Sequence, residues 1–325
     1  MHRNLIIITI ISSIVFSCNT STPKTLQNNL SKWNDTPIKK EIIEFVNTVT
    51  NINNTNYVSP KERIAVFDND GTLWNEKPLY IPLEFELDYI KTHYSEKPEW
   101  KNDEFFSKLA NDDLSPFKEY SSIDLIQKLF GAHQGQIETE YKQNAYDFLS
   151  NKNHPKFNRP FKEMIYSPMV ELVKYLQENE FKVFIVTGGE ITFARTVSEE
   201  IYNIPMENVI GSNVGMEYVN DTSDPYIIRT NEIKSANDKH IKPTNIELHI
   251  GRKPIFAAGN SNGDYEMMEY TLSGQGPSMA ILVNHDDADR EYAYMHGTEK
   301  AIADAQEKGW RVVSMKNDFK EIFSK

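Results

Sequence analysis

Cysteine is nearly absent from this 325-residue sequence, which has only Cys18. Without a second cysteine, an intramolecular disulfide is excluded in any redox compartment. Long apolar runs are also missing, since no stretch after the first 20 residues is apolar enough to cross a bilayer. None of the eight histidines forms an HExxH signature or a similar pair, which argues against zinc catalysis.

Basic residues are in deficit, because 35 Lys and Arg face 47 Asp and Glu, for a formal net charge of −12. Binding to nucleic-acid backbones needs clustered Lys and Arg, so we expect no nucleic-acid partner. An anionic substrate would need a local positive pocket. The 39% hydrophobic and 25% charged content is ordinary for a soluble globular body, and the length suits one catalytic domain with an insertion. No obligate protein partner is evident.

The N-terminus has the pattern of an export signal. A basic start precedes an apolar run over residues 5–16, the length of a signal-peptide core. The run leads into Val-Phe-Ser-Cys ending at Cys18, which resembles a bacterial lipobox, although Phe16 is bulky for it. We expect residues 1–17 to be a signal peptide, Cys18 to be lipidated and 18–38 to be a polar tether. This predicts an exported lipoprotein anchored to a membrane, on the periplasmic side or cell surface; a plain secretory signal is the alternative.

Short apolar runs indicate the strands of the body. They cover residues 64–67, 183–186, 255–258, 280–283 and 310–314. Continuous apolarity over four or five residues is typical of a parallel strand that is covered on both faces. Helical periodicity lies between the runs, for example from Met169 to Leu176, where Ser167 and Pro168 are expected to start a helix. The alternation predicts an α/β fold, a Rossmann-like doubly wound parallel sheet.

Residues 74–160 interrupt this alternation with helical patterns and no convincing buried strand. They are predicted to form an inserted α-helical cap, and 39–73 with 161–325 the core. The insertion is rich in aromatic residues, which more often form a module's own core than a ligand-binding wall. Residues 208–230 alternate like a hairpin, which indicates a small β excursion.

Polar motifs follow the predicted strands. The first run is followed by Asp68-Asn69-Asp70-Gly71-Thr72, at a strand end where open α/β sheets bind ligands. Two aspartates separated by one residue are usually turn formers. Further motifs in chain order favour a chemical role: Thr187-Gly188-Gly189 after the second run, Lys242-Pro243 before the third, and residues 259–264 after it.

Over most of residues 60–285, these motifs resemble the four motifs of the haloacid dehalogenase (HAD) superfamily, most closely its phosphoserine-phosphatase-like branch. The resemblance implies a Mg²⁺-dependent phosphomonoesterase that hydrolyses small organic phosphates through an aspartyl-phosphate intermediate. Asp68 would be the nucleophile and Asp70 the general acid and then base. Dehalogenases of the superfamily lack an acid at the second position, so Asp70 favours phosphate hydrolysis or transfer. The insertion occupies the place of a C1-type cap.

The resemblance also assigns the phosphate contacts. Thr187 would hydrogen-bond a phosphoryl oxygen, and Gly188 and Gly189 would offer N–H groups at a helix N-terminus. Lys242 would neutralise charge on the nucleophile and phosphate. Each residue alone would more often be a strand-end cap or a surface lysine. Other lysines compete for the role of Lys242: Lys239 and Lys253.

Magnesium is the cofactor that the resemblance implies, and it prefers hard oxygen ligands. Asp68 and the main-chain carbonyl of Asp70 would supply two of them. The family's last loop typically begins Gly-Asp, but this chain has Asn260, so either Asn260 or Asp264 could be the loop ligand. Glu76 follows the first motif closely and is expected to contact the leaving group.

Two other functions stay open: a HAD phosphotransferase, or a catalytically weak ligand-binding lipoprotein with the same fold. The presence of both Asp68 and Asp70 argues against the weak binder. A charged run after the fourth predicted strand, from Asp286 to Arg290, is expected to be a solvated loop.

Overall fold

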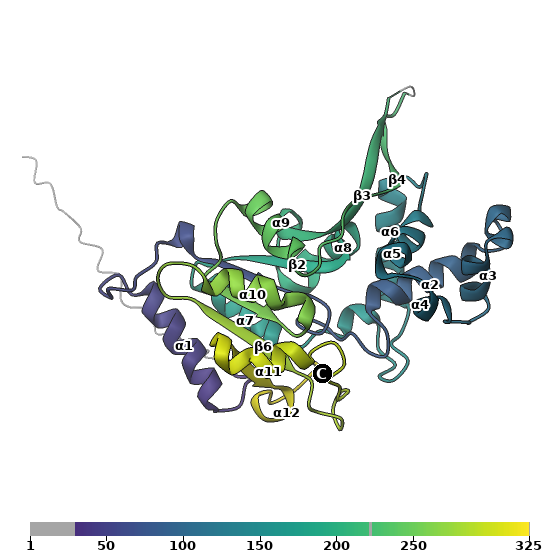
Figure 1. The fold of residues 1–325 in the computed structure, drawn as a ribbon. Helices are drawn as coiled ribbons and strands as arrows, with labels where there is room; N and C mark the ends of the chain where they lie inside the picture. Colours follow the sequence, from purple (N-terminus) through teal and green to yellow (C-terminus); the bar gives the residue numbers. More distant parts are fainter. Residues whose placement is uncertain (1–29, 221–222, 325) are drawn as a thin grey trace, which may run out of the picture.

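The computed structural model describes residues 30–220 and 223–324 (Figure 1). Its centre is a seven-stranded sheet in the order β4-β3-β2-β1-β5-β6-β7. The strands are β1 Ile64–Phe67, β2 Lys182–Glu190, β3 Val209–Val219, β4 Tyr226–Ser235, β5 Phe256–Gly259, β6 Met279–Asn284 and β7 Arg311–Ser314. The predicted α/β fold is confirmed. The sheet is mostly rather than wholly parallel, because β3 and β4 pair antiparallel.

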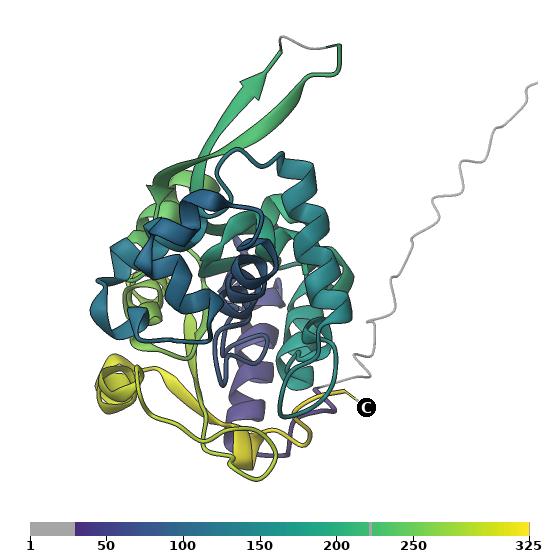
Figure 2. The ribbon, with the colours of Figure 1, turned by 90° about the vertical axis from the view of Figure 1, so that its right-hand side faces the viewer.

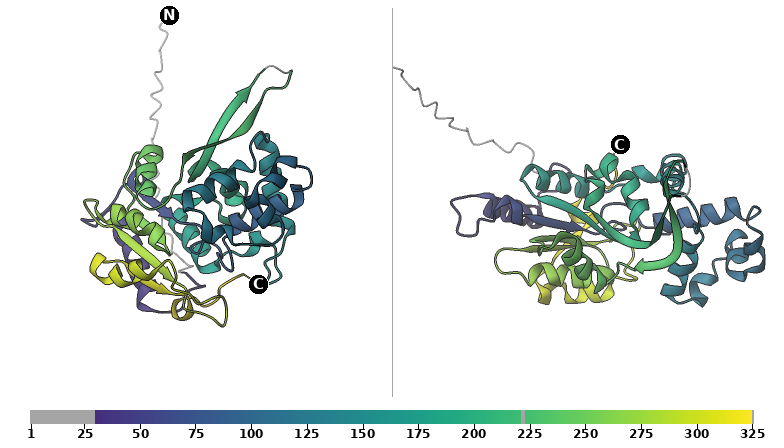
Figure 3. Two further views of the ribbon diagram at one scale, coloured as in Figure 1. Left: turned by 45° about the vertical axis from the view of Figure 1, so that its right-hand side comes forward. Right: turned by 90° about the horizontal axis from the view of Figure 1, so that it is seen from above.

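Helices cover both faces of the sheet (Figure 3). They are α1 Pro37–Thr50, α2 Ile81–His93, α3 Glu104–Ala110, α4 Pro116–Glu119, α5 Ser122–Gly131, α6 Glu138–Asn151, α7 Ser167–Glu178, α8 Ile191–Tyr202, α9 Ile241–Ile250, α10 Tyr265–Leu272, α11 Glu299–Lys308 and α12 Met315–Asp318. In β1, Ala65 and Phe67 pack in a core with α1 and α7, whereas Ile64 and Val66 pack in a core with α9, α10 and α11. Burial on both faces explains why the strand is a continuous apolar run.

The start of α7 differs from the prediction at one residue. Helix α7 begins at Ser167, but Tyr166 occupies the cap position and Ser167 is already helical. The Ser167 main-chain N–H donates to Ile322 O at 2.8 Å, and its hydroxyl lies 2.9 Å from Ser324 Oγ. Ser167 therefore ties the helix to the C-terminal segment and is not an N-cap, whereas Pro168 does lie in the first turn as expected.

The predicted β excursion is partly a strand of the central sheet. Val209 and Ile210 pair parallel with β2 and are buried. The rest of β3 pairs with β4 to form a hairpin that rises from the sheet beside the helical insertion (Figure 1, Figure 2). The buried start of β3 is too short to form a long apolar run in the sequence. The alternating pattern of the hairpin that follows is therefore easier to recognise than the strand within the sheet.

Helices α2 to α6 follow β1 and precede β2, and they gather at one end of the molecule, on the right in Figure 1. Their aromatic side chains pack largely among themselves; Trp100, Phe105 and Phe106 belong to one buried cluster and Phe85 to another. The expectation that these aromatics form the core of the inserted segment is confirmed for Trp100, Phe105 and Phe106, whereas Phe85 also packs against Phe193 of α8, 5.2 Å between ring centroids.

The segment before α1 is packed rather than free. Leu30 and Trp33 are buried, and Trp33 Nε1–H donates to Pro168 O at 2.9 Å while its ring meets Phe319 edge-on at 5.0 Å. The predicted tether of residues 18–38 is therefore wrong from residue 30 onward, because isolated apolar side chains anchor that part. The predicted signal peptide 1–17 and Cys18 lie outside the described residues. Across residues 30–220 and 223–324, the helices are too short or too polar to span a membrane.

Candidate active site

The predicted site residues gather where the strand order reverses. Strand β1 is followed along the chain by β2 on one side and later by β5 on the other. Asp68 continues β1, and its N–H donates to Ala258 O at 2.9 Å, so the loops after β1 and β5 start side by side. This is the crevice in which open α/β sheets bind ligands.

A glycine shapes the loop after β1. Gly71 has φ +77°, a conformation that other residues rarely adopt, and a Cβ there would lie 2.0 Å from Asn260 Nδ2. The amides of Thr72 and Leu73 donate to Asn69 O at 3.1 and 2.8 Å, which closes the turn. The Gly71 position thus lets the loop that carries both aspartates fold directly against the loop after β5.

Lys242 lies between two buried carboxylates. Its Nζ is 2.7 Å from Asp68 Oδ1 and 2.6 Å from Asp264 Oδ1. Burial lowers the pKa of Lys242, but the two carboxylates outweigh this and raise it, so the ammonium stays charged. The structure places the competing lysines elsewhere: Lys253 Nζ donates to Ser273 Oγ at 3.0 Å, and Lys239 is exposed.

Asp70 has different neighbours. Trp74 Nε1–H donates to its Oδ1 at 2.9 Å, and the Thr187 hydroxyl lies 3.5 Å from its Oδ2. Burial raises the pKa of Asp70 to about 7, with Glu76 adding to the rise and the Trp74 hydrogen bond opposing it. The two carboxylates thus have different partners, an ammonium for Asp68 and an indole N–H for Asp70, while burial raises the pKa of both. No sequence motif predicts the contact between Trp74 and Asp70.

The Thr187-Gly188-Gly189 segment lies at the same edge but does not begin a helix. Strand β2 runs on to Glu190, and Glu190 Oε2 accepts the Phe193 N–H at 2.8 Å, which caps α8. The expected anion site at this helix N-terminus is therefore wrong, because a protein carboxylate already fills it. Gly189 N–H donates to Thr187 Oγ1 at 2.9 Å, which orders the turn beside Asp70.

Hydrogen bonds in the loop after β5 distinguish between the two candidate metal ligands, Asn260 and Asp264. Asp264 Oδ2 accepts the N–H groups of Asn260 and Ser261 at 3.0 and 3.1 Å, and its Oδ1 holds Lys242. Both oxygens of Asp264 are thus engaged inside the protein. Asn260 is 1% exposed; its Oδ1 accepts the Thr72 hydroxyl at 3.3 Å, and its Nδ2 has no hydrogen-bond partner among the described residues. Asn260 Oδ1 therefore has one long hydrogen bond from a hydroxyl, whereas both oxygens of Asp264 are held by charged or main-chain donors, so Asn260 is the freer oxygen ligand of the two.

Glu76 lies on the side of the helical insertion. It is 4% exposed, and Lys77 Nζ is 3.3 Å from its Oε1. The same ammonium lies over the Tyr294 ring at 4.2 Å and the Tyr80 ring at 5.4 Å. Glu76, Asp70 and other site carboxylates raise the pKa of Tyr80, whose ring is 49% exposed. Glu76 is close enough to Asp70 for its carboxylate to add to the raised pKa of that residue.

The charged run after β6 is only partly a solvated loop. Asp287 is 2% exposed and accepts from Arg290, whose guanidinium also donates to Met315 O at 2.7 Å. A fully buried acid next to this run, Glu291, accepts the Tyr166 hydroxyl at 3.0 Å. The expectation of a solvated loop is wrong for Asp287 and Arg290, which join the C-terminal segment to the body, whereas Asp289 is exposed as expected.

Glu291 also lies next to a histidine that sequence reasoning missed. His285 Nδ1 is 3.6 Å from Glu291 Oε2, and His285 Nε2 is 2.8 Å from Gly71 O. The loop after β6 therefore supports the loop of the two aspartates. Neither residue lies in a motif, and no local spacing could have found them.

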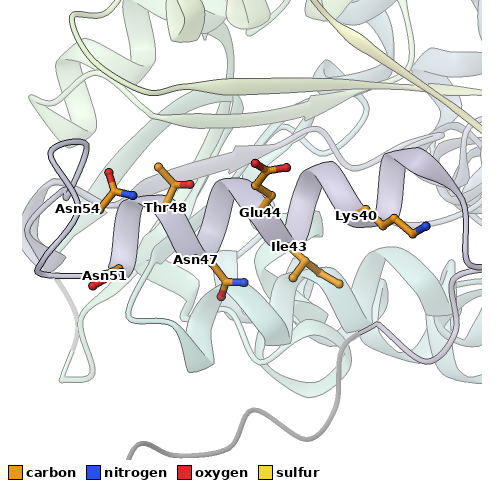
Figure 4. Close-up of a pocket in the computed structure, with 7 residues that line it drawn as sticks. All are labelled: Lys40, Ile43, Glu44, Asn47, Thr48, Asn51 and Asn54. Carbon is orange, nitrogen blue, oxygen red and sulfur yellow. The ribbon is translucent and has the colours of Figure 1, made fainter.

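A hollow of about 350 Å³ lies elsewhere, along the outer face of α1 (Figure 4). Its lining comes from one helix and the turn that follows: Lys40, Ile43, Glu44, Asn47, Thr48, Asn51 and Asn54. None of the predicted site residues lines it. The cluster at the carboxyl edge of the sheet is thus the candidate active site.

The sheet order and this cluster define an α/β protein with a helical insertion and a group of buried carboxylates and a lysine at the carboxyl edge of its sheet. The sequence model described as haloacid dehalogenase-like hydrolase matches residues 65–269, more than half of the chain. The protein therefore belongs to the haloacid dehalogenase-like hydrolase family.

Solved structures share the fold at low sequence identity. A protein of unknown function from Bordetella pertussis Tohama I aligns with a TM-score of 0.54 and 14% identity, covering 78% of this chain and 98% of that one. A conserved, functionally unknown protein from Anaerococcus prevotii DSM 20548 aligns with a TM-score of 0.57 and 13% identity, covering 85% of this chain and 91% of that one. A phosphoserine phosphohydrolase-like protein from Francisella tularensis aligns with a TM-score of 0.42 and 21% identity, covering 77% of this chain and 94% of that one. At this TM-score the two folds are only distantly alike. No curated protein matches the chain in sequence.

Proposed function

We propose that this hydrolase is a Mg²⁺-dependent phosphomonoesterase that acts on small organic phosphates with Asp68 as nucleophile. The observation that carries the proposal is the contrast between its two neighbouring carboxylates. Asp68 lies 2.7 Å from the Lys242 ammonium, whereas Asp70 is held by Trp74 and Thr187. A nucleophile has to be ionised and a general acid has to carry a proton. The Lys242 ammonium opposes the rise that burial causes in the pKa of Asp68, and bound Mg²⁺ would oppose it further, whereas burial favours a proton on Asp70.

In the first step, an Asp68 oxygen bonds to phosphorus while the bond from phosphorus to the leaving oxygen breaks. Asp70 gives its proton to that oxygen, so the products are an alcohol and the aspartyl phosphate. In the second step, Asp70 takes a proton from water, whose oxygen attacks phosphorus. The bond to Asp68 then breaks, inorganic phosphate leaves and Asp70 is protonated again. The Thr187 hydroxyl and the Lys242 ammonium stabilise charge on the phosphoryl oxygens.

The family generally uses Mg²⁺, and the oxygen atoms at the carboxyl edge of the sheet are of the hard kind that this ion prefers. Asp68, the main-chain carbonyl of Asp70 and the Asn260 side-chain oxygen would hold it, while Asp264 would support the loop through Lys242. Burial raises the pKa of Asp68, next to Asp264, and Lys242 only partly offsets this rise. Bound Mg²⁺ would supply further positive charge that favours ionised Asp68 and a bound phosphate.

The first test is release of inorganic phosphate from p-nitrophenyl phosphate. We expect turnover with Mg²⁺, and a fall of at least about a hundredfold after EDTA treatment, restored by added Mg²⁺. Ca²⁺ is the matched control, because its larger size and looser geometry suit this chemistry poorly. Turnover that EDTA leaves unchanged would refute the metal-dependent mechanism, and no turnover on a broad phosphate panel would favour a binding role.

Helices α2 to α6 are proposed to form a C1-type cap, with residues 74–160 as its extent. Asp68 and Asp70 are 6% and 9% exposed, so the described arrangement is nearly closed to water. A closed site protects an acyl phosphate from side reactions. Under this proposal, Glu76 and Lys77 would contact the leaving group.

The chain is also proposed to be an exported lipoprotein, with Cys18 acylated after removal of residues 1–17. The support is the sequence alone: the apolar run at 5–16 and its Val-Phe-Ser-Cys end. Mass spectrometry of the mature N-terminus tests it, with Cys18→Ser as the control that should lose both acyl mass and membrane association. A mature chain that begins at another residue, or at Cys18 without acyl mass, would refute it.

A further inference from the structure

A buried arginine lies between two acids outside the catalytic cluster. Arg229, on β4, is 1% exposed; its Nη1 is 2.8 Å from Glu138 Oε2 and its Nη2 is 2.9 Å from Glu190 Oε1. Its guanidinium also lies over the Tyr141 ring, with Cζ 3.8 Å from the centroid. Burying three charges is unfavourable unless each is paired and hydrogen-bonded, so this triad is unlike a surface salt bridge.

The two acids that pair with Arg229 belong to different parts of the chain. Glu190 follows Gly189 directly, and its second oxygen caps α8 at the Phe193 N–H. Glu138 begins α6 of the insertion, and its second oxygen accepts the Thr192 hydroxyl at 2.7 Å. All four carboxylate oxygens therefore have a partner, and two of those partners lie in the first turn of α8.

The main chain of Arg229 joins the same parts. Arg229 N–H donates to Gln136 O at 3.0 Å, and Arg229 O accepts the Gly135 N–H at 2.8 Å. From the other strand of the hairpin, the Ser212 hydroxyl donates to Gly188 O at 2.7 Å. The hairpin thus holds the helical insertion on one side and the Thr187-Gly188-Gly189 turn on the other (Figure 1).

We propose that Arg229 is a positioning residue for the hydrolase site, acting through Glu190 on the Thr187-Gly188-Gly189 turn and through Glu138 on the helical insertion. The inference rests on the proposed function in one respect, which is that the Thr187 hydroxyl of this turn contacts the phosphoryl group. Arg229 itself touches no reacting atom in the proposed mechanism. Its role is to fix the distance between the turn and the segment that covers it.

The geometry requires arginine rather than any cation. A planar guanidinium presents N–H groups in two fixed directions, one for each carboxylate, whereas a lysine ammonium is a single point at the end of a flexible chain. Arg229→Lys should keep the charge but hold only one acid well. Arg229→Met removes the charge and leaves Glu138 and Glu190 buried without a counter-ion.

Hydrogen exchange of the free protein tests the proposal without substrate. We expect amides of residues 187–193 to exchange at least about tenfold faster in Arg229→Met than in wild type, and Arg229→Lys to lie between them. Amides of β6 should stay unchanged. The matched control is Arg252→Met, because Arg252 pairs with Glu62 at 2.7 Å on the surface, with both side chains 45% exposed.

Steady-state kinetics give the second readout. In Arg229→Met the inhibition constant for inorganic phosphate should rise about tenfold, with partial recovery in Arg229→Lys. Equal acceleration of exchange in β6 and in 187–193, or wild-type exchange and phosphate inhibition in Arg229→Met, would overturn the proposal. If Arg229→Met does not fold, Arg229→Lys and Glu138→Gln carry the same comparison. A wild-type protein without phosphatase activity would refute the proposed function but leave the exchange test valid.

Discussion

Asp68→Asn should lower turnover of p-nitrophenyl phosphate by at least about a thousandfold, since an amide cannot take the place of an attacking carboxylate. The substitution is nearly isosteric, and Lys242 keeps its 2.6 Å partner Asp264, so the fold should persist. Phosphate release per active enzyme is the measurement, with far-ultraviolet circular dichroism and thermal unfolding as checks on folding.

The matched control for this variant is Asp112→Asn. Asp112 is an aspartate of the helical insertion whose side chain is 79% exposed, and it should tolerate the change with wild-type turnover. Turnover of Asp68→Asn within tenfold of wild type would show that another group attacks phosphorus. A trapped phosphoenzyme mapped to a residue other than Asp68 would do the same.

The strands could be predicted because burial on both faces leaves a direct trace in the sequence. Residues 64–67 are apolar without interruption, and all four residues of β1 are buried. The site could be located for a related reason, because polar residues directly after such strands are carried to the same edge of the sheet. Local sequence is therefore sufficient to predict that Asp68, Thr187 and Asn260 meet at one edge of the sheet.

Partners that are distant in the chain left no such trace. Arg229 lies 91 residues from Glu138 and 39 from Glu190, and no spacing relates them. Leu30 and Trp33 are apolar residues in a polar segment, and only packing against the body reveals their burial. Asp264 is an intermediate case. The sequence predicts that Asp264 lies in the loop after the third apolar run. Only the hydrogen bonds of the structure show that both its carboxylate oxygens are bound by Lys242, Asn260 and Ser261.

Lys242→Met should destabilise the metal-free protein by about 3–5 kcal/mol, because it leaves the buried carboxylates of Asp68 and Asp264 facing each other without their shared cation. Urea unfolding in EDTA is the measurement, since added Mg²⁺ would supply part of the missing charge. Lys239→Met is the control: Lys239 is exposed three residues earlier, and its replacement should change the unfolding free energy by less than about 0.5 kcal/mol.

A double variant separates this charge effect from a packing effect. Asp264→Asn in the Lys242→Met background removes one of the two unpaired charges, so it should recover part of the lost stability, although the same change in wild type should destabilise. Activity should not return, because the proposed mechanism needs the ammonium beside Asp68. A double variant less stable than Lys242→Met alone would mean that the amide loses more as a hydrogen-bond acceptor for Asn260 and Ser261 than the removed charge restores. The stability of the loop after β5 would then depend on the acceptor oxygens of Asp264 more than on its charge.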